Sequence, residues 1–263
     1  MSEEKIKSEG KCLFCGKTFS KAGINRHLKT HFQDKSLVKK AGESFLLKVE
    51  PNPKYYGSAP FFLSLWVNGE STMSKIDDFL RGIWMECCGH LSAFRDPKRG
   101  QGAGPWDFFE AGELREKGKI KEYEELMEEA DGEIPMSRKV KNVFYPDLKL
   151  EYEYDFGSST YLTITIIDQF PFKADKNIVL LSRNEPLKLL CHVCKKEPAT
   201  QICNAHDWDE DSLFCPKCAE KHAKECEDFE DYAAMPIVNS PRMGVCAYEG
   251  GTIDVERDGV YQE

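Results

Sequence analysis

The order of apolar and polar positions in the middle of the chain predicts both strands and helices. Two alternating runs, 148–156 and 161–168, are joined by the short polar turn Gly157-Ser158-Ser159, which predicts a β-hairpin. Apolar residues at helical spacing predict an amphipathic helix over 72–84. Further strands are expected at 44–50, 60–67 and 90–94, and further helices at 106–130 and 137–144.

The length of 263 residues allows one substantial core with small modules, or two domains. Charged residues make up 31% of the chain, and no apolar run approaches the roughly 18 residues that cross a bilayer. The N-terminus also lacks the apolar segment of a signal peptide. We therefore expect a cytoplasmic protein.

The charge is distributed unevenly along the chain. The first forty residues contain ten Lys and Arg against four acidic residues, a net +6, so the rest carries −15 and the total is −9. An acidic body with a basic N-terminal part would contact nucleic acid only through that part.

The N-terminal part contains Cys-x2-Cys, eleven residues, and His-x3-His. The four candidate ligands are Cys12, Cys15, His27 and His31. This spacing resembles a Cys2His2 zinc finger that is one residue shorter than usual between its pairs. Phe19 stands at the position of the finger's aromatic core residue, and Ile24, three residues before the first histidine, at the second core position. The pattern predicts one zinc ion.

The role of such a finger stays open at the level of sequence. One finger reads about three base pairs, too few for useful specificity alone. Polar or basic residues on or before its helix are available for phosphates or base edges: Ser20, Lys21, Gly23, Asn25 and Arg26. The alternatives are a zinc-stapled surface for a protein partner and a structural cap.

A second ligand-rich stretch lies between residues 191 and 226. Its four pairs are Cys191/Cys194, Cys203/His206, Cys215/Cys218 and His222/Cys226. Pairs at this spacing, in a chain without an export signal, favour thiolates on zinc over disulfides. Because a site with four nitrogen or sulfur ligands is closed, we expect structural zinc here.

The four pairs can close in different ways. Crosswise pairing resembles MYND and B-box modules and gives two zinc ions, one on Cys191, Cys194, Cys215 and Cys218, the other on Cys203, His206, His222 and Cys226. The rival is a one-ion zinc ribbon on the first four, with the other four unligated or with Asp207, Asp209 or Asp211 substituting. The whole chain is thus predicted to bind three zinc ions, or two with the ribbon.

The remaining candidates receive structural interpretations. Cys87, Cys88 and His90 lie in an apolar region, where a free cysteine is expected to pack as a small buried hydrophobe. His192 and Cys246 remain unassigned as ligands. Asp155, at the hairpin bend, is expected to accept backbone hydrogen bonds in the turn.

The central part also resembles a known family. Tyr154-Asp155-Phe156-Gly157 at the bend, the helix 73–84 and His90-Leu91-x-x-Phe94 are similar to the plasmid pRiA4b Orf-three-like domain family. The resemblance covers about residues 45–178 and extends to 183–186 and 238–246. It implies an α+β domain without an established activity, and some members are passenger proteins of insertion elements.

We therefore expect an α+β protein with an antiparallel hairpin, flanked by two small zinc modules. The expected divisions are a finger at 1–40, an α+β domain at 44–186, a cross-brace zinc module at 187–230 and a tail at 231–263 that packs on the centre. The leading hypothesis is a non-enzymatic zinc protein that binds nucleic acid or a protein partner and is linked to mobile DNA. The alternatives are an enzyme with a pocket around Asp155, Tyr154 and His90, and a protein-interaction adaptor.

Overall fold

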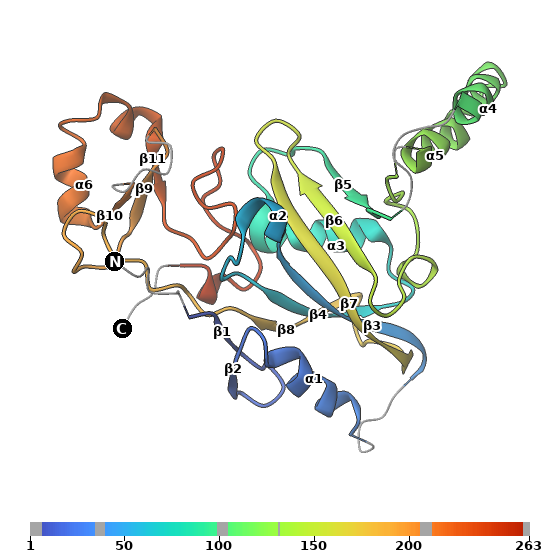
Figure 1. Ribbon diagram of the computed structural model, residues 1–263, viewed down its shortest axis with the longest axis horizontal. Coiled ribbons are helices and arrows are strands. Elements are labelled where there is room, and N and C mark those ends of the chain that lie inside the picture. Colours follow the sequence, from blue (N-terminus) through green and yellow to red (C-terminus); the bar gives the residue numbers. More distant parts are fainter. Residues whose placement is uncertain (1–6, 35–39, 99–104, 131, 206–211, 260–263) are drawn as a thin grey trace.

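The computed structural model describes residues 7–34, 40–98, 105–130, 132–205 and 212–259, and its architecture is α+β, as predicted (Figure 1). The main sheet is antiparallel, with strand order β5-β6-β7-β3-β4-β8. Its strands are β3 (Ala41–Pro51), β4 (Leu63–Asn68), β5 (Ser92–Arg95), β6 (Lys149–Tyr154), β7 (Thr160–Phe172) and β8 (Ile178–Arg183). The predicted hairpin is confirmed, since β6 pairs with β7 from Lys149–Thr165 to Tyr154–Thr160.

Two small sheets belong to the two cysteine-rich regions. They are formed by β1 (Glu9–Lys11) with β2 (Thr18–Ser20), and by β9 (Gln201–Cys203), β10 (Leu213–Phe214) and β11 (Ala234–Pro236). The α-helices are α1 (Ile24–Phe32), α2 (Pro53–Tyr56), α3 (Met73–Leu80), α4 (Pro105–Glu116), α5 (Ile120–Ala130) and α6 (Pro216–His222). Two π-helical segments, η1 (Arg81–Met85) and η3 (Phe229–Ala233), and two 3-10 segments, η2 (Val140–Asn142) and η4 (Val255–Arg257), complete the helices of the described residues.

The first face of the main sheet carries the largest core. Alternate strand residues point to the same face, and Phe45, Leu47 and Val49 of β3 are fully buried there. Helix α3 and η1 cover this face with apolar residues three or four apart, among them Ile76 and Leu80. This periodicity explains why the helix was predictable from sequence.

The second face of the sheet is covered by residues 9–34, here called the finger. Leu46 lies between two residues of the first core and therefore points the other way, toward helix α1. The buried residues of this second core are Cys12, Ile24, Leu28 and Phe32 of the finger, and Leu46, Phe62, Phe172 and Leu181 of the sheet region. The finger is thus part of the packing of the main sheet (Figure 1).

The finger is also joined to the β8 edge through the backbone. Gly10 forms a bridge with Asn184, and the Leu13 N–H donates to the Leu181 carbonyl over 2.9 Å. A Cβ on Gly10 would lie 2.5 Å from the Arg183 carbonyl oxygen and 2.6 Å from Phe62. Only glycine permits this close approach.

Residues 237–258, here called the C-terminal segment, return from the second cysteine-rich region to η1. The Gly82 carbonyl accepts from the Thr252 and Ile253 N–H groups, over 2.7 and 3.0 Å. The Ser240 hydroxyl donates to the Trp84 carbonyl over 2.8 Å. Because η1 is a π-helix, a type of turn often found at functional sites, the groups around this junction are candidates for function.

Two expected helices differ from the structure. The segment 106–130 forms two helices, α4 and α5, because Gly118 adopts the left-handed region at φ 69° and ends the first. The pair projects away from the sheet in Figure 1. The helix expected at 137–144 is reduced to the single turn η2, and the strand β8 was not predicted. No helix in the described ranges is long and apolar enough to cross a membrane.

We predict that Gly10→Ala destabilises the protein by about 1–3 kcal/mol, the usual cost of overpacking, because the new Cβ would separate β1 from β8. Urea unfolding of the purified variant measures the change. The control is Gly112→Ala in α4, where a Cβ would meet nothing within 4 Å. Equal stability of Gly10→Ala and the wild type would contradict the docking of the finger.

Candidate metal centres

The finger brings its four predicted ligands together. The Sγ of Cys12 lies 3.5 Å from Nε2 of His31, and the Sγ of Cys15 lies 3.3 Å from Nε2 of His27. The two Nε2 atoms are 3.1 Å apart. All four ligand atoms lie within 4.8 Å of one another and could hold a metal ion.

Local structure explains this convergence. Gly16 follows the second cysteine at φ 74°, and its N–H donates to the Cys12 carbonyl over 2.8 Å, which closes the turn that carries both thiols. His31 is four residues after His27, so both project from one side of α1. Phe19 stacks on the His27 ring at 3.9 Å, at the core position predicted for it.

Burial adjusts the ionisation of these ligands. It lowers the pKa of His27, with a further contribution from the positive charge of His31, and so favours the neutral imidazole that binds metal. Burial raises the pKa of Cys12, which favours the neutral thiol while no cation is nearby. A bound cation would reverse this preference.

Some of the residues that the sequence analysis gives as candidates for nucleic-acid contacts instead join the finger to the main sheet. Lys21 forms an ion pair with Glu50 over 2.9 Å and also donates to the Ala59 carbonyl. Asn25 accepts a hydrogen bond from the Ser64 hydroxyl over 2.8 Å. Arg26 stays exposed. Two of the five candidate residues, Lys21 and Asn25, therefore hold the finger against the sheet.

The second cysteine-rich region contains a four-cysteine cluster, Cys191, Cys194, Cys215 and Cys218, whose sulfurs all lie within 4.8 Å of one another. The first pair sits on a turn like that of the finger. Lys195 follows it at φ 56°, and its N–H donates to the Cys191 carbonyl over 2.9 Å. The second pair lies at the start of α6, where the Cys218 and Ala219 N–H groups donate to the Cys215 carbonyl.

The thiols of this cluster have opposed pKa shifts. Burial would raise the pKa of Cys191, but hydrogen bonds from backbone groups, first that of Cys194, outweigh it and lower the value to about 6. Burial and hydrogen bonds to Cys215 and Cys191 raise the pKa of Cys218 to about 12. Without a cation, one thiolate thus suppresses the ionisation of its neighbours.

A third group contains Cys203, His222 and Cys226, also with ligand atoms within 4.8 Å. Phe214 stacks on the His222 ring at 4.2 Å, as Phe19 does on His27 in the finger. His206, the fourth predicted ligand, lies outside the described residues. This third group, here called the Cys203 group, and the four-cysteine cluster together correspond to the crosswise pairing of the four Cys/His pairs.

Sequence reasoning missed a fourth group, here called the Cys87 cluster. Cys87, Cys88 and His90 converge with Cys246, and these four also lie within 4.8 Å of one another. The expectation that the first two are buried hydrophobes is wrong for Cys88, which is exposed, and Cys87 is only half-buried. Because 156 residues separate His90 from Cys246, no spacing motif could reveal the group.

The residues of the enzyme hypothesis have structural partners. Asp155 is buried at φ 66°, and its Oδ1 accepts from the Gly157 and Ser158 N–H groups, which confirms the expected turn. Its Oδ2 accepts from the buried Arg242 over 2.6 Å. Burial alone would raise the Asp155 pKa, but these bonds, first that of Arg242, lower it. The carboxylate is therefore committed to the fold.

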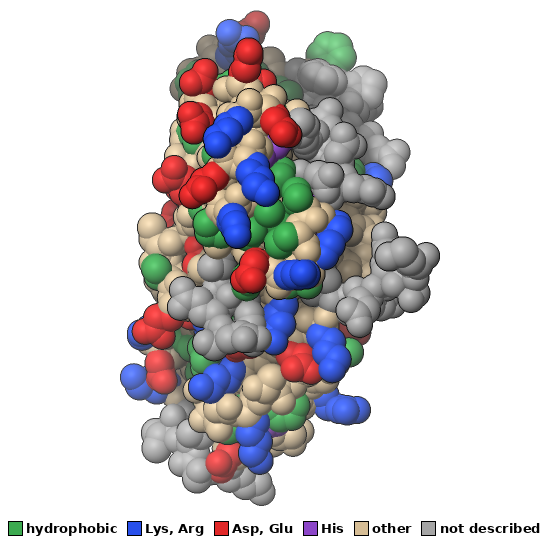
Figure 2. Space-filling model, turned by 90° about the vertical axis from the view of Figure 1, so that its left-hand side faces the viewer, with side chains coloured by type: hydrophobic (Ala, Val, Ile, Leu, Met, Phe, Trp, Pro, Cys, Tyr) green, Lys and Arg blue, Asp and Glu red, His purple; other side chains and the backbone are tan. Residues whose placement is uncertain are grey.

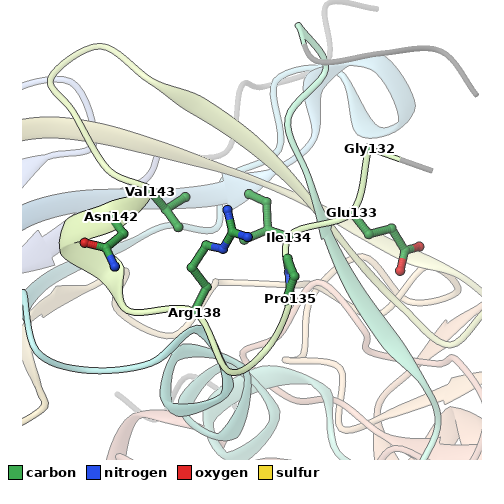
Figure 3. Close-up of a pocket in the computed structure, with 7 residues that line it drawn as sticks. All are labelled: Gly132, Glu133, Ile134, Pro135, Arg138, Asn142 and Val143. Atoms are coloured by element: carbon green, nitrogen blue, oxygen red, sulfur yellow. The ribbon is translucent and has the colours of Figure 1, made fainter. Parts of the chain in front are cut away.

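Two cavities have linings that include no residue of the four metal groups. The one in Figure 3 has a volume of about 120 Å³, and the Glu133 carboxylate at its rim accepts from Arg95 over 2.6 Å. Its lining comes from residues 132–143. A second, about 560 Å³, is lined by Pro51, Tyr56, Ala59, Pro60, Phe61, Ser159, Ser240, Pro241, Met243 and Val245. Neither lining includes Asp155, Tyr154 or His90.

No family model and no curated protein matches the chain. Among solved structures it is similar to a protein of unknown function, MM3350, from Methanosarcina mazei Go1, at 14% sequence identity. The match covers 73% of this chain and 88% of that chain, with a TM-score of 0.36. So weak a likeness carries no argument, and the resemblance to the pRiA4b Orf-three-like family stays a prediction.

We predict that Glu50→Gln destabilises the protein at pH 7 by about 1 kcal/mol, a value reduced for solvent screening. Burial would raise the Glu50 pKa, but hydrogen bonds from Lys48 and Lys21 outweigh it and lower the value. The carboxylate thus stabilises the fold above its unfolded pKa of about 4.3, and this contribution is lost as the pH falls through the folded pKa.

Urea unfolding of the wild type and Glu50→Gln between pH 7 and pH 3 measures this effect, and the two stabilities should converge at the acid end. Glu113→Gln, which removes an exposed ion pair with Lys117, is the control and should change little. A difference that does not vary with pH would refute the role of the Lys21–Glu50 pair.

Proposed function

We propose that the protein is a zinc-binding protein with structural ions at the finger, the four-cysteine cluster and the Cys203 group, where His206 completes the third set. The observation that carries the proposal is the spacing of the ligand atoms. Tetrahedral zinc places two sulfurs about 3.8 Å apart and a sulfur and a nitrogen about 3.6 Å apart. The corresponding separations are 4.0 Å for Cys194–Cys215 and 3.5 Å for Cys12–His31.

The ligand sets favour a structural role over catalysis. Catalytic zinc usually has three protein ligands and an open position, whereas four cysteine or histidine ligands close the coordination sphere. The module around the four-cysteine cluster also has only small apolar cores, such as that of Phe214 and Phe229. Structural zinc, on the order of 10 kcal/mol per site, would supply most of its folding free energy.

For the partner, we propose nucleic acid, contacted through phosphates. Lys11, Lys17 and Arg26 of the finger are exposed, and in Figure 2 Lys and Arg side chains lie among Asp and Glu side chains over the whole face. Since Lys21 and Asn25 are engaged with the sheet, little is left to read bases. Binding through these cations would be weakly specific and strongly dependent on salt.

Metal analysis tests the first proposal. The purified protein is expected to contain at least three zinc ions per chain, and Cys194→Ser and Cys15→Ser should each remove one. The control His192→Ser, which changes the neighbour of a ligand, should leave the zinc content unchanged. Inductively coupled plasma mass spectrometry counts the ions, and a wild-type protein without zinc would overturn the proposal.

A gel shift with short DNA and RNA duplexes tests the second proposal. The double variant Lys17→Glu/Arg26→Glu should lose most of the binding seen at about 50 mM salt, since each lost phosphate contact reduces both affinity and salt dependence. The double variant Lys54→Glu/Lys75→Glu, which reverses two exposed lysines outside the finger, is the charge-matched control. Equal binding by all variants, or none by the wild type, would leave a protein partner as the better hypothesis.

A further inference from the structure

The Cys87 cluster joins two segments that are far apart in the sequence. Cys87, Cys88 and His90 lie in the turn between η1 and β5, and Cys246 lies in the C-terminal segment. The Sγ atoms of Cys88 and Cys246 are 3.7 Å apart, and the Cys246 Sγ lies 3.5 Å from Nε2 of His90. Three sulfurs and one nitrogen thus face one another.

These separations are those of a metal tetrahedron. Two sulfurs on one zinc ion are about 3.8 Å apart, and a sulfur and an imidazole nitrogen about 3.6 Å. The Cys87 cluster agrees with these values as closely as the finger does, where the sulfur–nitrogen separations are 3.3 and 3.5 Å. A disulfide between Cys88 and Cys246 would instead need the two sulfurs about 2 Å apart.

We propose that Cys87, Cys88, His90 and Cys246 form a further zinc site, which fastens the C-terminal segment to the turn after η1. Three thiolates and one imidazole are a usual ligand set of structural zinc. The site is independent of the three assigned above, because it shares no ligand with them.

The backbone at this site is arranged to present the ligands. Gly89 adopts φ 74°, its N–H donates to the Glu86 carboxylate over 2.6 Å, and the chain bends at Cys87 and Cys88. Cys246 itself adopts φ 50°, which is unfavourable for a residue with a side chain. Such strain is commonly retained where a side chain has to meet a ligand.

Neighbouring groups complete the surroundings expected of a metal site. While Nε2 of His90 faces Cys246, its Nδ1 lies 3.5 Å from Oδ1 of Asp155. A carboxylate on the second ring nitrogen orients a zinc-bound histidine in many sites. The Arg242 guanidinium lies 3.6 Å from the Cys87 Sγ and 2.6 Å from Asp155, where it would offset the net negative charge of zinc with three thiolates.

The distribution of all the cysteines among the groups supports this assignment. The chain has eleven, and all of them belong to one of the four groups. The C-terminal segment already meets η1 through hydrogen bonds, such as that from Ser240 to the Trp84 carbonyl. A zinc ion would hold the same junction through ligands from the turn after η1 and from the C-terminal segment.

Zinc content of the full-length chain tests the proposal. Cys246→Ser and Cys88→Ser should each contain one zinc ion fewer than the wild type, whatever the wild-type total, so the result does not depend on the other three sites. Val245→Ala, beside the ligand, should keep the full content. Unchanged zinc in both serine variants would overturn the proposal.

Two further measurements keep the test decisive if the serine variants fold poorly. Cys246→His replaces a sulfur ligand by a nitrogen ligand, so this variant should keep the ion. In the cobalt-substituted protein, its thiolate-to-metal absorption should be weaker than that of the wild type by the contribution of one cysteine ligand. Thiol titration of the denatured, unreduced wild type should find all of the cysteines as free thiols. Two thiols fewer, with Cys88 and Cys246 joined in a peptide map, would show a disulfide and overturn the zinc site.

Discussion

The fold depends on sulfur atoms being held close together at several points. Burial makes each thiolate charge more costly, and thiolates at such separations also repel one another; both effects contribute to the raised pKa of Cys218. A divalent cation removes both costs, because it neutralises the thiolates and fixes their positions. Each cluster therefore has to be considered together with the segments that it connects.

The segments that carry the metal groups also cover the main sheet or adjoin its cover. An antiparallel sheet with apolar residues on both faces needs two covers, and α3 supplies only the first. The finger supplies the second, with Leu28 and Phe32 against Leu46, and Gly10 at the β8 edge. The C-terminal segment meets η1 through hydrogen bonds, and the Cys87 cluster lies at the same junction. The candidate metal groups and the packing of the central sheet are thus parts of one structure.

Much of the fold and of the site was predictable where the signal is local. The hairpin around Asp155, helix α3 and the two-residue spacing of the cysteine pairs all depend on neighbours in the sequence. Other contacts join residues that are far apart in the sequence, and no local pattern predicts them. Examples are the ion pair of Lys21 with Glu50 and the contact of Cys246 with His90. The break at Gly118 was missed because Glu and Lys are mixed along residues 106–130 on both sides of it, as on one solvated helix.

The most direct test of this account is X-ray diffraction from crystals of the full-length protein at the zinc absorption edge. Anomalous difference density locates each ion without reference to the surrounding chain. The account predicts one peak within each of the four groups, about 2.3 Å from the sulfurs, including the Cys87 cluster. Cysteine sulfurs without anomalous density between them, or joined as disulfides, would contradict it.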